Sequence, residues 1–244
     1  GSLYRNIRDM MENRENTAAI QAEFPDPGVV RRNTGYALDE LASTSFFTDG
    51  ETRHSTFNFC RLIAGSEGTL GFITAARLEL DPLPPPKKAL VPVHVNSVMD
   101  AIRGNLIALK HSPSAVELMD RIILELTSGN ITQNKNRFFL KGSPGAILIV
   151  EFVAETMEEI NRVASAMEQD FRASGIGYHF PVIKGDDIPR VWSLRKAGLG
   201  VLSKMKGDAK PVSVIEDTSV LPSKLEAYIS EFNLLLERYG LDCV

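Results

Sequence analysis

Apolar and polar residues follow two different patterns along this chain, and these patterns predict its secondary structure. Short runs of consecutive or alternating apolar residues indicate β-strands, whereas apolar positions spaced three and four apart indicate helices. The predicted strands are 72–80, 89–95, 114–119, 146–153, 178–183 and 212–217. The predicted helices are 4–24, 97–110, 120–128, 156–174, 186–205 and 222–239. Helices that alternate with strands predict an α+β or α/β layer fold.

The clearest interruption of these patterns is "DPLPPPKK" at residues 81–88, where four of eight residues are proline. Such a segment favours an extended, fairly stiff connector. We therefore expect a domain border here, with residues 82–88 linking a first part, 1–81, to a second part, 89–244. Two polar segments, 44–56 and 129–142, are predicted to be loops.

Composition places the chain among globular proteins, because 43% of its 244 residues are apolar and 24% are charged. A formal net charge of −4 gives no electrostatic reason to expect nucleic acid or an anionic membrane as a partner. No apolar run approaches the roughly 18 residues of a membrane span, so we expect at most peripheral membrane association. Cys60 and Cys243 fit no metal or redox spacing, which favours a reducing, cytoplasmic setting.

The two ends of the chain favour a piece of a longer protein. Gly1-Ser2 resembles a remnant of cloning, and residues 241–244 read as the start of a strand that follows a helix. We therefore expect an excised fragment.

The segment "GSEGTLGFIT", residues 65–74, combines three glycines with an acidic residue directly before a predicted strand. Glycine-rich turns allow the backbone to approach a ligand and can direct N–H groups at an anion. The segment is neither a P-loop, which ends in Gly-Lys-Ser/Thr, nor the dinucleotide fingerprint, which precedes a helix. A plain tight turn, in which glycine supplies positive φ, is the alternative that the pattern leaves open.

Two ordered motifs resemble a known family. "FNFCRLIAGSEGTLGFITAARLELDPLP" is similar to the signature of FAD-linked oxidases of the vanillyl-alcohol oxidase (PCMH-type) superfamily, and "RRNTGYALDEL" resembles the stretch that precedes it. The group includes D-lactate dehydrogenases, the glycolate oxidase flavin subunit and D-2-hydroxyglutarate dehydrogenase. Ala37 stands where the family usually has Asp, and the longer intervening loop resembles the subgroup fused to an iron–sulfur oxidoreductase.

This resemblance implies an α+β fold in two parts. Residues 1–81 would be the C-terminal part of a PCMH-type FAD-binding domain, and residues 89–244 a truncated substrate domain with a ferredoxin-like antiparallel sheet covered by helices. The family's main pyrophosphate-binding loops are missing, so this fragment should hold FAD weakly or not at all.

The resemblance also implies which residues lie against FAD. In the family the glycine-rich segment packs its backbone on the cofactor. Ser66 and Thr69 could donate hydrogen bonds, and Glu67 would be a turn-stabilising acceptor or the partner of an arginine. The implied cofactor-binding residues are Asn33, Tyr36, Gly65, Ser66, Glu67, Gly68, Thr69, Gly71, Ile73 and Thr74.

A charged residue interrupts an apolar stripe in the predicted helix 186–205. Arg195 falls among Ile188, Trp192, Leu199 and Leu202 at helical spacing. An unpaired buried guanidinium costs several kcal/mol, so it needs an anion opposite it. The spacing leaves three solutions open: an internal ion pair, for instance with Glu216 or Asp217, a side chain that reaches solvent at the helix edge, or a bound anionic ligand.

The resemblance favours the ligand. "WSLRKAG" and "VIEDTSVLPSKL" are similar to the family's helix and strand in which an arginine pairs with the substrate carboxylate, so that role is carried onto Arg195. A lysine contact of the family falls on Ile215, and Lys210 could replace it, although a solvated loop lysine is the alternative. "SAVELMD" matches a stretch near the site, in which we expect Glu117 and Met119 to be structural.

No metal site is expected, because none of His54, His94, His111 and His179 has a second His or Cys at ligand spacing. By resemblance, the general base and metal site lie beyond residue 244, and the fragment itself should be inactive.

The resemblance implies a parent that oxidises a small D-2-hydroxy acid by hydride transfer to FAD and passes electrons to an iron–sulfur module or a quinone. Two rivals remain open: a non-catalytic small-ligand or assembly module, and an alcohol or aryl-alcohol oxidase of the same fold.

Overall fold

The computed structural model describes residues 1–29, 35–44, 57–198, 200, 208, 215, 218–241 and 243. The chain divides into two compact units, Gly1–Leu80 with Asp217–Leu221, and Asp81–Glu216 with Pro222–Val244. The predicted strand 212–217 lies outside the described residues except at position 215, and so do two of the predicted site residues, Asn33 and Lys210.

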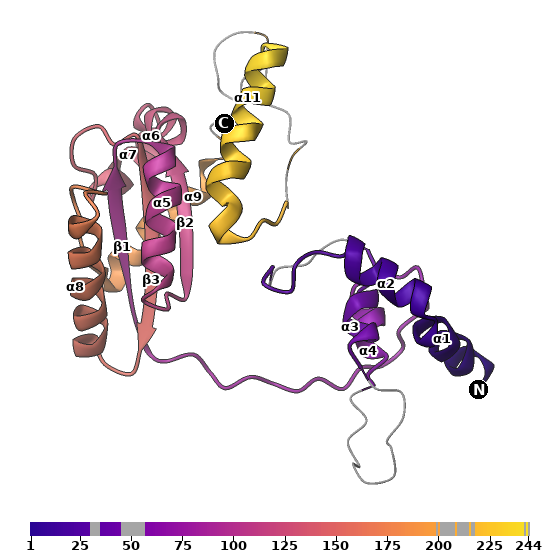
Figure 1. The fold of residues 1–244 in the computed structure, drawn as a ribbon. Helices are drawn as coiled ribbons and strands as arrows, with labels where there is room; N and C mark the ends of the chain where they lie inside the picture. Colours follow the sequence, from indigo (N-terminus) through magenta and orange to yellow (C-terminus); the bar gives the residue numbers. More distant parts are fainter. Residues whose placement is uncertain are drawn as a thin grey trace. The chain divides into compact units, whose positions relative to one another are not determined.

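The second unit is built on a four-stranded antiparallel sheet (Figure 1). Its strands are β1 (Lys87–Val95), β2 (Ala115–Asp120), β3 (Ala146–Ala154) and β4 (Ile183–Lys184), in the order β2-β3-β1-β4. Helix α5 (Val98–Leu109) follows β1, and α8 (Met157–Ala173) follows β3. This β-α-β-β-α-β arrangement is the ferredoxin-like topology, so the predicted α+β class is confirmed.

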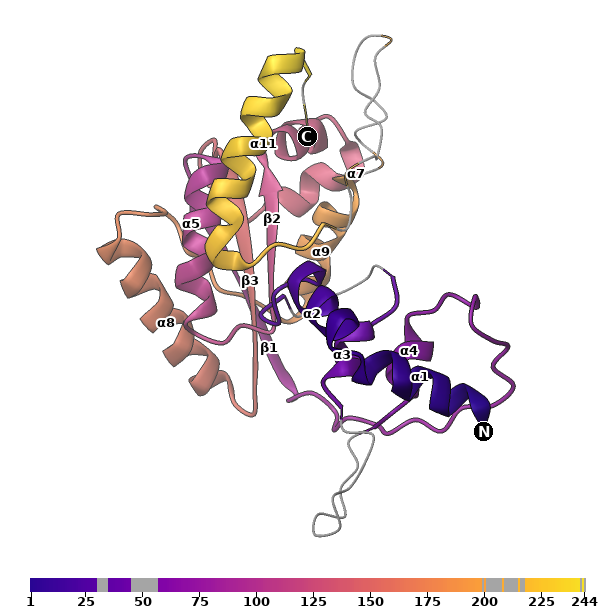
Figure 2. The ribbon, with the colours of Figure 1, turned by 45° about the vertical axis from the view of Figure 1, so that its right-hand side comes forward.

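Helices α5 and α8 cover one face of this sheet, as Figures 1 and 2 show. The β1 residues 89, 91, 93 and 95 point to this face together with the even-numbered residues of β3, as the two-residue period of a strand requires. The core between sheet and helices contains Val91, Val93, Leu148, Val150, Ile160, Met167 and Phe171. Helix α8 begins with a capping box, in which Thr156 and Glu159 satisfy each other's backbone N–H groups.

The opposite face of the sheet is also covered. Helices α6 (Arg121–Ser128), α7 (Ile131–Asn134) and α9 (Ile188–Lys196) and the short helix η1 (Lys135–Arg137) lie on this side (Figure 2). The buried residues here are Leu90, Met119, Leu124, Phe139, Ile147, Ile149, Ile183, Val191 and Leu194. Because both faces of β1 and β3 are buried, these strands read as nearly continuous apolar runs.

Helix α11 (Leu225–Tyr239) follows the short helix η3 (Pro222–Lys224) and lies against α5. The Arg103 Nη2 atom lies 2.7 Å from the Glu226 Oε1 atom, which joins the two helices. Gly240 ends α11 in the left-handed conformation that glycine adopts without cost.

The regular secondary structure described in the first unit is helical. It contains α1 (Ser2–Glu12), α2 (Arg14–Glu23), α3 (Leu38–Ala42) and α4 (Cys60–Ala64). Met11, Ile20, Leu41 and Leu62 form its small buried core. The prediction of a single helix over 4–24 was wrong, because Asn13 leaves the helical conformation and its side chain accepts hydrogen bonds from the Glu15 and Asn16 N–H groups, which starts a second helix.

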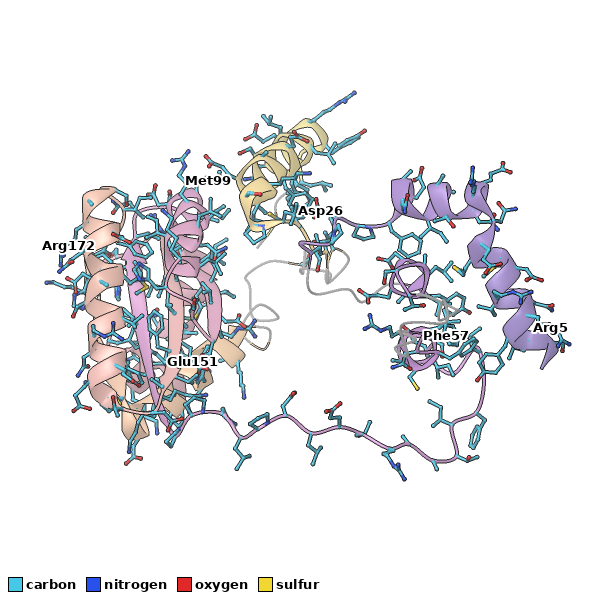
Figure 3. All side chains as sticks on the ribbon, turned by 60° about the horizontal axis from the view of Figure 1, so that its bottom comes forward. Arg5, Asp26, Phe57, Met99, Glu151 and Arg172 are labelled. Carbon is cyan, nitrogen blue, oxygen red and sulfur yellow. The ribbon has the colours of Figure 1, made fainter. Side chains whose placement is uncertain are left out.

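The structure corrects the prediction of a strand over 72–80. Residues 71–80 are extended but belong to no strand, and Phe72 and Leu80 are 93% and 84% exposed. Figure 3 shows the side chains of this segment projecting from an extended trace. The alternating pattern is real, but a strand also needs a neighbouring strand to pair with its N–H and C=O groups.

Smaller corrections concern three segments of the second unit. The predicted loop 129–142 contains α7 and η1, and Asn130 caps α7. The predicted strand 178–183 is reduced to β4 and an isolated bridge between His94 and His179. Within the predicted helix 186–205, α9 begins at Ile188 and ends at Lys196, with Ala197 as the C-cap, and residues 201–205 lie outside the described residues.

Candidate functional site

The glycine-rich segment of the first unit forms a tight turn directly after α4. The Thr69 N–H group donates to the Ser66 carbonyl at 2.9 Å, and the two residues between them, Glu67 and Gly68, have φ values of 50° and 77°. Two consecutive positive φ angles define a type I′ turn. Glycine adopts this conformation readily, whereas it costs a glutamate about 1 kcal/mol. Conformation alone therefore accounts for Gly68.

The two hydroxyl groups of this turn already have partners. Ser66 is buried, and its Oγ–H donates to the Ile63 carbonyl at 2.8 Å. Thr69 Oγ1 donates to the Ser66 carbonyl and lies 2.9 Å from the Tyr36 hydroxyl oxygen. The sequence suggested that both hydroxyl groups could donate hydrogen bonds to a cofactor. In the structure, each already donates to a backbone carbonyl of the turn or of α4. Within the described part of the chain, however, the backbone N–H groups of Glu67 and Gly68 have no hydrogen-bond partner.

The structure brings several of the predicted cofactor residues together and separates others. Tyr36 meets the turn through Thr69, and a Cβ atom placed on Gly65 would lie 3.5 Å from the Gly35 carbonyl oxygen. Gly71, Ile73 and Thr74 instead lie on the exposed, extended segment that follows.

Arg195 lies in the last turn of α9, beside the buried residue Leu194. Val191 and Leu194 are fully buried against the sheet, whereas 47% of the Arg195 side chain is exposed. The expectation that Arg195 interrupts the buried stripe was therefore wrong. The buried face of α9 is one residue away from the predicted one, and Arg195 stands at its border.

The partner of Arg195 is Glu117, which lies on β2. The Glu117 Oε2 atom accepts from Arg195 Nε at 3.1 Å and lies 2.8 Å from Arg195 Nη2. Glu117 pairs in register with Ile149 and points to the face of the sheet that α9 covers. Sequence reasoning named Glu216 and Asp217 as partners and missed Glu117. The signal was present, because Glu117 and Met119 share one face of β2 by the period of two.

A second carboxylate lies nearby on the same face, but other groups bind it. Glu151, labelled in Figure 3, is 8% exposed and forms an ion pair with Lys88 at 3.2 Å. Its Oε1 atom also accepts a hydrogen bond from the Ser114 hydroxyl at 2.9 Å. Glu151 is thus neutralised without Arg195.

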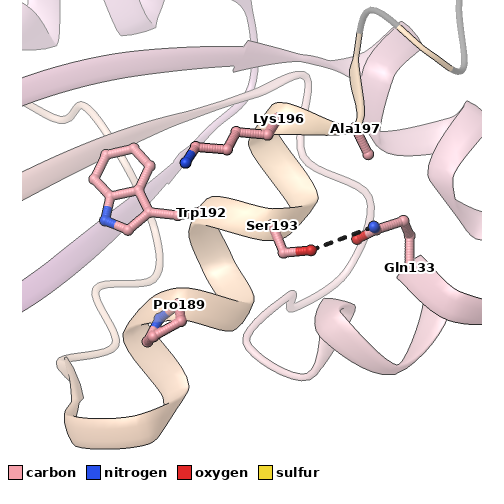
Figure 4. A pocket seen from close by; sticks show the side chains of 6 residues that line it. All are labelled: Gln133, Pro189, Trp192, Ser193, Lys196 and Ala197. Atoms are coloured by element: carbon pink, nitrogen blue, oxygen red, sulfur yellow. Dashed lines mark hydrogen bonds between the residues drawn. The ribbon is translucent and has the colours of Figure 1, made fainter.

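The opposite side of α9 borders an open hollow of about 590 Å³ (Figure 4). It is lined by Gln133, Pro189, Trp192, Ser193, Lys196 and Ala197. Gln133 Nε2 donates to Ser193 Oγ at 3.3 Å. The two adjacent cations of α9 are thereby separated, since Lys196 lines this hollow and Arg195 meets Glu117.

His94 is a fully buried histidine of β1, paired in register with Ile147 of β3. Its Nδ1–H group donates to the Pro92 carbonyl at 2.9 Å, and its Nε2 atom accepts from the Lys141 N–H group at 3.3 Å. Burial, opposed by the bond to Pro92, lowers the pKa of His94 to about 4, and the neighbouring His179 adds to this lowering. The residue is a neutral structural group in the core.

Among the residues that the structure describes, no group of three His, Cys, Asp or Glu side chains could hold a metal ion. No helix in the described ranges is both long enough and apolar enough to cross a membrane.

Comparison with known proteins agrees with this architecture. Residues 84–244 match the C-terminal domain of FAD linked oxidases, which spans the whole sheet and α9. The chain therefore belongs to the family of FAD linked oxidases.

Its relatives define the group more closely. The chain is 31% identical to a D-2-hydroxyglutarate dehydrogenase of Pseudomonas putida and 32% identical to one of Escherichia coli, and each match covers 99% of the chain. It is 24% identical to the glycolate oxidase subunit GlcD of Bacillus subtilis, over 76% of the chain and 37% of that protein. The chain spans about 23% of the length of the two dehydrogenases.

Proposed function

We propose that the protein is part of a flavoenzyme that oxidises a small 2-hydroxy acid, and that Arg195 binds the carboxylate of this substrate. The observation that carries the proposal is the half-exposed side chain of Arg195 on α9, in a family whose relatives are named as D-2-hydroxyglutarate dehydrogenase and glycolate oxidase subunit. A planar guanidinium binds a carboxylate through two parallel hydrogen bonds, which fixes both the position and the orientation of the acid.

In this proposal FAD would supply the redox chemistry as the acceptor of a hydride from the α-carbon, and the hydroxyl proton would pass to a general base, so that the 2-hydroxy acid becomes a 2-oxo acid. The turn 65–69 would lie against FAD with the backbone N–H groups of Glu67 and Gly68, since its hydroxyl groups are already bonded. Tyr36 would support the turn through Thr69. Residues 1–81 would then be the end of the FAD-binding domain.

The finer parts of the proposal rest on the family resemblance. Lys210 would be a second contact to the substrate, and Asn33 would be close to FAD. Electrons would leave to an iron–sulfur module or a quinone in a cytoplasmic enzyme. This chain by itself would bind FAD weakly and would be inactive.

Visible spectroscopy of the full-length protein tests the proposal. We expect a flavin absorbance band that bleaches when D-lactate, D-malate or D-2-hydroxyglutarate is added under anaerobic conditions. Bleaching by one acid and not by the corresponding alcohol would support a carboxylate-binding site. A colourless protein that cannot be reconstituted with FAD would contradict the proposal.

A further inference from the structure

The ion pair between Arg195 and Glu117 has a geometry that assigns a role to the glutamate. A guanidinium offers two edges to a carboxylate, one formed by Nε and Nη2 and the other by Nη1 and Nη2. Glu117 occupies the first edge with a single oxygen, Oε2, at 3.1 Å from Nε and 2.8 Å from Nη2. Arg195 Nη1 has no partner within the described part of the chain, so none of the described residues occupies the second edge.

We infer that Glu117 is a positioning residue, which holds Arg195 by its inner edge so that the outer edge can bind the substrate carboxylate. The inference rests on the proposed function, because it assigns the orientation of the arginine that would bind the acid. It changes the expectation for Glu117, which the sequence placed among the structural residues.

The surrounding fold fixes both partners of the pair. Val191 and Leu194 anchor α9 on the sheet, and the pairing of Glu117 with Ile149 fixes β2 beneath it. The other acidic side chain on this face, Glu151, is bound by Lys88 and Ser114. Glu117 is thus the carboxylate on this face that is directed to Arg195.

Orientation should outweigh repulsion between the two carboxylates. A side chain such as arginine loses much rotamer freedom when it is fixed, and misplacing a binding group by about 1 Å can cost on the order of 100-fold in rate. By contrast, two unit charges 4 Å apart interact by about 1 kcal/mol in bulk water and by about 4 kcal/mol near a protein surface. Because 47% of the Arg195 side chain and 37% of the Glu117 side chain are exposed, water screens this repulsion toward the lower value.

The test uses the full-length flavoenzyme and measures the concentration of hydroxy acid that half-saturates flavin reduction, separately from the maximal rate. We expect Glu117→Ala to raise the half-saturating concentration about tenfold or more, because it releases the inner edge of Arg195. Glu117→Gln keeps an acceptor oxygen but loses the charge, so it should raise the half-saturating concentration less than Glu117→Ala does. An unchanged or lowered half-saturating concentration in Glu117→Ala would overturn the inference.

Two further variants separate positioning from a general structural role. Glu226→Gln removes the charge from an Arg–Glu pair of similar exposure, between α5 and α11, and should leave the half-saturating concentration unchanged. When Arg195 is already replaced by lysine, Glu117→Ala should raise the half-saturating concentration little further, because the two residues act through one contact. If the two substitutions instead raise it by independent factors, the positioning role is contradicted. Equal flavin content and melting temperature would establish that each variant is folded.

The result also separates this inference from the proposed function. If Arg195→Lys leaves the half-saturating concentration unchanged, the proposed function fails. If Arg195→Lys raises it and Glu117→Ala does not, the positioning role alone is overturned.

Discussion

The two units of this chain use strand-like apolar segments in opposite ways. In the second unit, β1 and β3 lie side by side and bury apolar residues on both faces of the sheet. In the first unit, residues 71–80 also carry many apolar residues, yet Phe72 and Leu78 are 93% and 77% exposed. The difference teaches that an apolar pattern specifies a strand only together with a partner edge and a face to cover.

The second unit also has the larger apolar core. The second unit has two extensive apolar clusters, one on each face of its sheet. The first unit buries Met11, Ile20, Leu41 and Leu62 among its described residues. Because the entropy of ordering the chain must be offset by burial, the second unit should unfold cooperatively and at the higher denaturant concentration.

The substitution expected to destabilise the second unit most is at Gly145, the residue directly before β3. A Cβ atom there would lie 1.9 Å from the Asn96 carbonyl oxygen, and the Gly145 N–H group donates to the Val95 carbonyl. We expect Gly145→Ala to lower the free energy of unfolding by about 4 kcal/mol, because the backbone at residue 145 and the backbone at Asn96 would have to move apart. Denaturant unfolding followed by circular dichroism measures the loss.

A glycine in open space provides the control for this change. Gly129 has a φ of −77°, and a Cβ atom on it would meet nothing within 4 Å. Gly129→Ala should change the free energy of unfolding by less than about 0.5 kcal/mol. Equal losses in the two variants would contradict the packing described around Gly145.

A pair of apolar truncations compares β3 with the extended segment 71–80 directly. Ile149 is fully buried in β3, whereas Leu78 is 77% exposed. We expect Ile149→Ala to cost about 3 kcal/mol and Leu78→Ala less than about 0.5 kcal/mol in the free energy of unfolding. A large loss in Leu78→Ala would mean that the extended segment packs in this chain in solution, and the comparison would collapse.

The buried histidine makes the stability of the second unit depend on pH. Burial lowers the pKa of His94 from 6.5 to about 4, so the unfolded chain binds the proton more readily than the folded one. The stability that the folded protein owes to a neutral His94 is therefore fully present above pH 6.5 and is lost as the pH falls toward 4. The lowered pKa of His179, which burial also causes, acts in the same direction.

We expect the free energy of unfolding to fall by about 3 kcal/mol across this window because of His94. Unfolding midpoints measured at several pH values would show the slope, and His94→Gln should flatten it. A steeper loss above pH 6.5 than below it would argue against a neutral, buried His94.

The smallest expected effect is at a helix cap. Thr156 accepts a hydrogen bond from the Glu159 N–H group at 3.2 Å at the start of α8. Thr156→Ala should lower the free energy of unfolding of the second unit by about 1 kcal/mol, and Thr156→Ser should not. If the alanine and serine variants unfold at the same denaturant concentration, the capping interaction contributes nothing measurable.

The sequence predicted the sheet of the second unit well, because β1 and β3 carry long apolar runs, β2 carries a short apolar segment, and the helices between them have clear apolar faces. It failed where a local pattern was not enough. The break at Asn13 depends on a side chain that competes with the helix for its own backbone, and α7 depends on the cap at Asn130.

The candidate site was predicted in part. Arg195 was singled out by its charge among apolar neighbours, and its family motif gave it a role. Its contact with Glu117 joins residues 78 positions apart in the sequence, and a period-two pattern cannot say which helix covers a strand face. The hydroxyl groups of Ser66 and Thr69 were predicted as donors, but no sequence pattern reveals that the turn itself uses them.

The most direct test of the account is the dependence of flavin reduction on hydroxy-acid concentration in full-length protein with Arg195 and with Arg195→Lys. Lysine keeps the charge but cannot form two parallel hydrogen bonds, and charge-assisted bonds contribute about 1.5–3 kcal/mol each. We predict that the half-saturating concentration rises about tenfold or more, while the spectrum of the bound flavin is unchanged. A half-saturating concentration equal to that of the unaltered protein would contradict the account, because Arg195 would then not bind the substrate carboxylate.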